Sequence, residues 1–119
     1  MNTQKDFNGY TLTKFAKAMM EREEKMKLSH FGFYMYLVEK NNKLRWAETF
    51  GLPRNHTMIF CKISPDTYYK LLHDCESFGL IRIIDKGKNQ NQAAIITLQT
   101  EKLTAFIESR STKKHYPTS

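Results

Sequence analysis

The chain has few cysteines and no segment suited to a membrane. Its 119 residues include two cysteines, Cys61 and Cys75. Nothing approaches the roughly 18 consecutive apolar residues that a membrane-spanning helix requires. The opening segment, MNTQKDFNGY, also lacks the apolar core of an export signal. We therefore expect a cytoplasmic protein with no membrane partner, whose thiols are reduced and free.

Motifs for catalysis and for metal binding are also missing. The sequence contains no glycine-rich phosphate loop and no Gly-x-Ser-x-Gly. The candidate metal ligands lack the short Cys-x-x-Cys or His-x₃₋₅-His pairs of zinc sites. These candidates are His56, Cys61, His73 and Cys75. We expect a non-enzymatic protein with no metal and no cofactor.

The chain does contain enough apolar residues for one core, and an excess of positive charge. Hydrophobic residues make up 40% of the sequence, which suits a single folded domain of this length. The formal net charge of +7 favours a polyanionic partner such as double-stranded DNA. Residues 64–98 nevertheless carry four basic and four acidic side chains, so the excess charge lies outside that segment.

Residues 64–79 carry the strongest helix pattern. Ser64 can accept a hydrogen bond from the first free amides of a helix, and Pro65 suits the first helical position. Gly79 is typical of a helix end, where the backbone turns through the left-handed region. The apolar residues between them recur at the spacing of one helix face. They are Tyr68, Leu71, Leu72 and Cys75.

A hairpin is expected after this helix. Two β-prone runs, at 80–84 and 93–98, are joined by a long polar segment. This pattern predicts a projecting wing over 80–98. A short helix at 56–63 would complete a helix-turn-helix over 56–78. We therefore predict an α+β fold, a winged helix-turn-helix with a helical core and a two- or three-stranded β wing.

Further helices are expected on both sides of this motif. The N-terminal helix should span 10–27, with Leu12, Phe15, Ala16 and Met19 on its apolar face. A second helix, capped by Ser29, should continue to about residue 40, and another should span 101–110. No regular element is predicted for 43–55. The domain would then cover 1–110, followed by a disordered basic tail at 111–119.

The helix and the wing supply the candidate DNA-binding residues. The exposed face of the 65–78 helix would enter the major groove, while the wing would touch the minor groove or the phosphate backbone. The alternative is that these residues form an ordinary solvent-exposed helix face and a loop that only aids solubility. The candidates are Thr67, Tyr69, Lys70, His73 and Ser77 on the helix, Lys86, Lys88, Asn89, Gln90 and Asn91 in the wing, and Arg54 and Lys62 before the helix.

Four segments resemble a known family. They are LSHFGFYMYLVEKNNKLRW, FGLPRNHTM, ISPDTYYKLLHDCESFGLIRII and KNQNQAAIITL. Over about residues 28–98 the chain is similar to the N-terminal winged-helix domain of DnaD-type replication proteins, especially relatives on bacterial phages and mobile elements. The resemblance implies a part in replication initiation or helicase loading, with both DNA contact and self-association.

Two functional hypotheses follow. The first is a DNA-binding winged helix in replication initiation or transcriptional control of a phage or mobile element. The second is a protein-interaction or oligomerisation module with little DNA affinity. It would self-associate through the N-terminal helix or dock on a replisome protein. The local charge neutrality of 64–98 and the aromatic, Met-rich first 40 residues favour the second.

Overall fold

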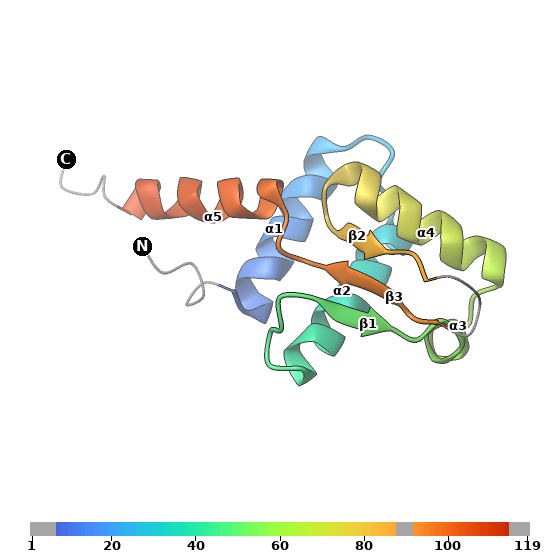
Figure 1. The fold of residues 1–119 in the computed structure, drawn as a ribbon. Helices are drawn as coiled ribbons and strands as arrows, with labels where there is room; N and C mark the ends of the chain where they lie inside the picture. Colours follow the sequence, from blue (N-terminus) through green and yellow to red (C-terminus); the bar gives the residue numbers. More distant parts are fainter. Residues whose placement is uncertain (1–6, 88–91, 115–119) are drawn as a thin grey trace.

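Helices and a small antiparallel sheet form an α+β fold (Figure 1). The structure is a computed structural model that describes residues 7–87 and 92–114, the last four by their backbone alone. In this part of the chain the elements are α1 (Gly9–Arg22), α2 (Leu28–Lys43), β1 (Phe50–Leu52), α3 (Arg54–Cys61), α4 (Pro65–Phe78), β2 (Arg82–Asp85), β3 (Ala94–Thr97) and α5 (Glu101–Lys114). The α+β expectation is confirmed. No described helix is long and apolar enough to cross a membrane.

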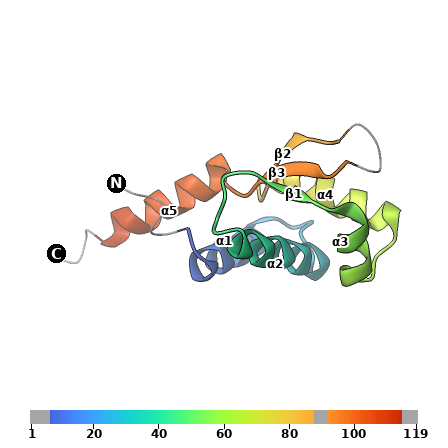
Figure 2. The same ribbon diagram turned by 60° about the horizontal axis from the view of Figure 1, so that its bottom comes forward.

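The sheet and the helices lie in layers. Helices α1 and α2 lie on one side of the sheet, with α4 beside its β2 edge (Figures 1 and 2). Helix α5 projects from the end of β3 and runs beside α1. Both ends of the described chain lie on the side of the molecule opposite α3.

Helix α4 begins and ends as predicted. The Ser64 side chain accepts a hydrogen bond from the Thr67 amide at 3.2 Å, and Pro65 is the first helical residue. Gly79 has φ +85°, the left-handed conformation that a glycine adopts at low cost. The predicted apolar face is buried in the core, as local periodicity indicated: Tyr68, Leu71, Leu72 and Cys75.

The predicted hairpin is present, with shorter strands. Strands β2 and β3 pair antiparallel, with Ile83 opposite Ile96. A bulge follows Ile83, because Asp85 rather than Ile84 pairs with Ile95. Strand β1 pairs with the other edge of β3, so the sheet order is β1-β3-β2.

The N-terminal helices differ from the prediction at their ends. Helix α1 stops at Arg22 instead of residue 27, because Met26 turns back to pack in the core. Helix α2 begins at Leu28, so Ser29 lies inside it and does not cap it. The amide of Lys27 donates instead to Nδ1 of His30 at 2.8 Å.

Three further elements also depart from the prediction. The 43–55 segment, for which no element was predicted, contains β1. Helix α3 covers residues 54–61 rather than 56–63, and Lys62 ends it with φ +58°. Helix α5 continues to Lys114, so 111–114 are helical rather than part of a disordered tail. This extension is reasonable because no glycine or proline occurs between residue 101 and Pro117. Residues 115–119 lie outside the described part.

Candidate nucleic-acid interface

A buried histidine fixes α4 against α2. His30 is 5% exposed, and its Nδ1 accepts the Lys27 amide, so the ring proton lies on Nε2. Nε2 donates to Oδ2 of Asp74 at 2.9 Å. The hydrogen bond from His30 lowers the pKa of Asp74; partial burial opposes this effect, and Lys70 adds to it. The Phe78 ring forms a T-shaped pair with the imidazole, with ring centroids 5.0 Å apart. The face of α4 that carries the candidate residues is thus held in a fixed orientation.

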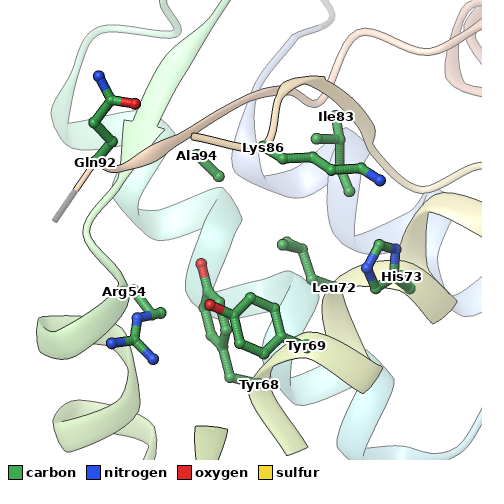
Figure 3. Close-up of a pocket in the computed structure, with 9 residues that line it drawn as sticks. All are labelled: Arg54, Tyr68, Tyr69, Leu72, His73, Ile83, Lys86, Gln92 and Ala94. Atoms are coloured by element: carbon green, nitrogen blue, oxygen red, sulfur yellow. The ribbon is translucent and has the colours of Figure 1, made fainter. Parts of the chain in front are cut away.

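A small cleft separates α4 from the hairpin (Figure 3). It encloses about 60 Å³ and opens to solvent. Its walls come from three parts of the chain: the start of α3, one side of α4 and both arms of the hairpin. The described lining residues are Arg54, Tyr68, Tyr69, Leu72, His73, Ile83, Lys86, Gln92 and Ala94. We call this site the α4–hairpin cleft.

The cleft has an apolar middle and polar ends. Leu72, Ile83 and Ala94 form the apolar part. In Figure 3, the Arg54 guanidinium lies on the same side as the hydroxyl groups of two tyrosines, whereas the Lys86 amine extends toward His73 on the other side.

The two tyrosines differ in exposure. Tyr68 is 2% exposed and Tyr69 is 44% exposed. Burial, together with the neighbouring Tyr69, raises the pKa of Tyr68 to about 12. Its hydroxyl therefore stays protonated near neutral pH and can donate a hydrogen bond.

None of the four acidic side chains of residues 64–98 lines the cleft. Asp74 accepts from His30 and from Lys70. Oε2 of Glu76 accepts the amide of Ile83 at 2.9 Å, and Oδ1 of Asp85 accepts the amide of Gly87 at 2.9 Å. The remaining acid, Asp66, is in the first turn of α4. None of the nine described lining residues is acidic, so the cleft is positive although the segment is neutral overall.

The structure brings four of the predicted DNA-binding residues to this one cleft. They come from three separate segments of the chain: Arg54, Tyr69, His73 and Lys86.

Other predicted residues lie elsewhere. The Thr67 hydroxyl accepts a hydrogen bond from Ser64, within the cap of α4. Lys70 forms an ion pair with Asp74 at 3.2 Å. Ser77 and Lys62 are exposed but do not line the cleft. Four wing candidates lie outside the described residues: Lys88, Asn89, Gln90 and Asn91.

Sequence reasoning assigned some lining residues to other roles. Tyr68 and Leu72 were placed on the core face of α4, and they are indeed buried. Both residues nevertheless also line the cleft. Ile83 and Ala94 were predicted as strand residues alone. The pairing of β2 with β3 determines which strand side chains face α4, so this pairing could have identified the two residues.

A second surface lies on α3. Ile59 is 77% exposed and Phe60 is 65% exposed, which is unusual for large apolar side chains on one short helix. The Phe60 ring lies 5.2 Å from that of Tyr36 on α2 and 6.5 Å from that of His56. The Lys40 amine lies 5.7 Å from the Tyr36 ring. We call Tyr36, His56, Ile59 and Phe60 the α3 surface.

The two cysteines are free and lie apart in the fold. Cys75 is fully buried, and Cys61 is partly exposed. Burial raises the pKa of both thiols; with the added effect of Asp74, that of Cys75 rises to about 12. Within the described part of the chain, no three His, Cys, Asp or Glu residues are grouped as a metal site would require.

Comparison with known proteins gives no match to a protein family, to a curated protein or to a solved structure. The function must therefore be inferred from the geometry and charge of these surfaces.

Proposed function

We propose that this chain is a non-enzymatic winged-helix module that binds double-stranded DNA. The observation that carries the proposal is that Arg54 before α4 and Lys86 in the hairpin meet at the α4–hairpin cleft, with no acidic side chain among its described lining residues. In this assignment α3 and α4 are the helix-turn-helix, and the β2–β3 hairpin is the wing. The helix face beside the wing would meet the groove, and Arg54 and Lys86 would contact phosphates.

The electrostatics predict modest affinity for a monomer. Few described basic groups line the cleft, and Lys70 is already paired with Asp74. We therefore expect binding in the non-specific range of about 10⁻⁴–10⁻⁶ M at physiological salt. The resemblance to DnaD-type proteins would place this activity in replication initiation or transcriptional control of a phage or mobile element.

A salt titration with a matched pair of charge reversals tests the proposal. Lys86→Glu and Lys17→Glu each change one exposed lysine by the same charge, at the cleft and on α1 respectively. Binding of the full chain to random duplex DNA should show a log–log salt slope of roughly −0.9 per phosphate contact. Lys86→Glu should weaken binding by about tenfold and reduce the slope by about 1.

The control variant tests whether DNA binding depends on the cleft or on the net charge of the protein. Lys17→Glu should leave the slope nearly unchanged and alter affinity far less. Equal losses in the two variants would mean that net charge, and not the cleft, drives binding. Wild-type protein that shows no salt-dependent affinity for DNA would refute the proposal.

The α3 surface supports a second candidate function, a protein-interaction module. The amine of Lys40 lies over the Tyr36 ring at the border of this surface, so a complementary partner segment would carry acidic and apolar residues. The predicted self-association face of α1 is less available, because its apolar residues pack within the same chain. They are Leu12, Phe15, Ala16 and Met19.

A double substitution separates the two functions. Ile59→Ser with Phe60→Ser removes exposed apolar groups and should leave folding and DNA affinity unchanged if the cleft binds DNA. For an oligomerisation module, sedimentation should instead show wild-type assemblies that the double variant dissociates. A monomeric wild type would count against oligomerisation.

A further inference from the structure

The distribution of charged and apolar groups in the α4–hairpin cleft is complementary to that of a single nucleotide. Its two sides carry the cations Arg54 and Lys86, which flank an apolar middle and an exposed aromatic ring. A nucleotide within a strand likewise combines a planar base, whose faces are apolar, with two phosphates on either side of its sugar. We propose that the cleft accepts one unpaired nucleotide of single-stranded or frayed DNA, with the base against Tyr69. This inference rests on the proposed DNA-binding function and narrows it.

Tyr69 is positioned to act as a stacking platform. Its side chain is 44% exposed, while its ring and that of Tyr68 form a T-shaped pair, with centroids 5.1 Å apart and planes at 75°. Tyr68 is itself immobilised, since it is 2% exposed and packs edge-on against Phe33 at 6.3 Å. The exposed ring is thus ordered before a ligand arrives, so less conformational entropy is lost on stacking.

The size of the cleft favours an unpaired base. An enclosed volume of about 60 Å³ that opens to solvent can receive part of one base but not a base pair. In a duplex, the bases are stacked inside and show only their edges in the grooves. The apolar floor of Leu72, Ile83 and Ala94 offers nothing to those polar edges, but it suits the face of a base that has left the stack.

The test compares single-stranded with duplex DNA. A short deoxythymidine oligonucleotide with one central 2-aminopurine is titrated with the full chain, and a blunt duplex of equal length competes for the protein. We expect tighter binding to the single strand and quenching of 2-aminopurine as it stacks. Tyr69→Ala should weaken single-strand binding by about tenfold and abolish the quenching.

Two further variants test whether the aromatic ring of Tyr69 is responsible for the single-strand affinity and the quenching. Tyr69→Phe keeps the ring and should retain affinity and quenching. Tyr10→Ala removes a 65% exposed tyrosine from α1, outside the cleft, and should behave as wild type. Circular dichroism checks that each variant is folded.

The outcomes also separate this inference from the proposed function. Duplex binding without a single-strand preference, or a Tyr69→Ala variant that still quenches, overturns the nucleotide site but leaves DNA binding intact. Failure of wild-type protein to bind either DNA overturns both.

Discussion

A single buried side chain, His30, performs two structural tasks. Its Nδ1 accepts the Lys27 amide at the start of α2, and its Nε2 donates to Asp74 of α4. The first bond fixes the ring proton on the nitrogen that the second bond needs. The pair therefore connects the start of one helix to the middle of another, and it sets the angle at which α4 presents the cleft.

Removing the Asp74 carboxylate tests how much this connection contributes to the free energy of unfolding. Asp74→Ala leaves the buried His30 donor without its acceptor, so the free energy of unfolding should fall by about 1–2 kcal/mol at neutral pH. Asp66→Ala removes the same charge from the first turn of α4 and should cost less, about 0.5 kcal/mol. Urea unfolding of both variants measures the difference, and equal losses would contradict the role of His30.

The effect should also depend on pH. The pKa of Asp74 is lowered in the folded state, chiefly by His30. Its contribution is therefore fully present above the unfolded-state pKa of about 3.9 and is lost as the pH falls through the folded-state pKa. The stability gap between wild type and Asp74→Ala should be constant near neutrality and shrink below about pH 4. If the stability gap below about pH 4 equals the gap near neutral pH, the acceptor is not a carboxylate.

At the level of elements, two serines that look alike in sequence have different roles. Ser64 caps α4 through the Thr67 amide, whereas Ser29 lies inside α2 and is exposed. Ser64→Ala should lower the free energy of unfolding by about 1 kcal/mol, because a first-turn amide loses its acceptor. Ser29→Ala should change it by no more than about 0.5 kcal/mol. Thermal or urea unfolding of the two variants compares them directly, and a larger loss at Ser29 would mean that it is the cap after all.

Local signals decided which elements could be predicted. Helix α4 and the hairpin were found because Ser64, Pro65 and Gly79 act on their nearest neighbours, and because the apolar spacing is regular. Strand β1 was missed because it has three residues and exists through pairing with β3, whose sequence lies more than 40 residues away. The end of α1 was placed too late for a similar reason, since burial of Met26 in the core is a tertiary event.

For the whole molecule, the C-terminal helix is joined to the core at several points. The Thr100 hydroxyl donates to the carbonyl of Gly79 at 2.8 Å and accepts the amide of Leu103 at 3.2 Å. Leu103 and Ile107 are 1% and 3% exposed, and Phe106 packs against Phe15. Helix α5 is therefore fastened to the end of α4 and to α1.

A matched pair of isoleucines tests this packing. Ile107→Ala should lower the free energy of unfolding by about 2–4 kcal/mol, since it leaves a cavity between α5 and the core. Ile59→Ala removes the same atoms from a side chain that is 77% exposed and should cost no more than about 0.5 kcal/mol. Chemical unfolding provides the comparison. A small effect at Ile107 would show that α5 is not part of the cooperative unit.

Part of the candidate site was predictable from the sequence, and part was not. Tyr69 and His73 were named because they lie opposite the apolar stripe of α4, and Lys86 because it follows a β-prone run. Lys70 satisfied the same criterion, but it pairs with Asp74 at i+4 on the same helix, a pairing that helical spacing could have indicated. The hydrogen bond from His30 to Asp74 could not be predicted in this way, because helical periodicity does not give the partners of a side chain on other elements.

Local sequence signals were sufficient to predict the α+β class, the bounds of α4 and the existence of the hairpin, because caps, periodicity and β propensity act between near neighbours. Which charged groups from distant segments lie close together depends instead on the packing of those segments. A count over 64–98 gives neutrality, yet folding engages Asp74, Glu76 and Asp85 in hydrogen bonds and gathers Arg54 and Lys86 at one cleft. Electrostatic interactions depend on distances in space, and those distances follow from the packing of α4 against α2 and the hairpin.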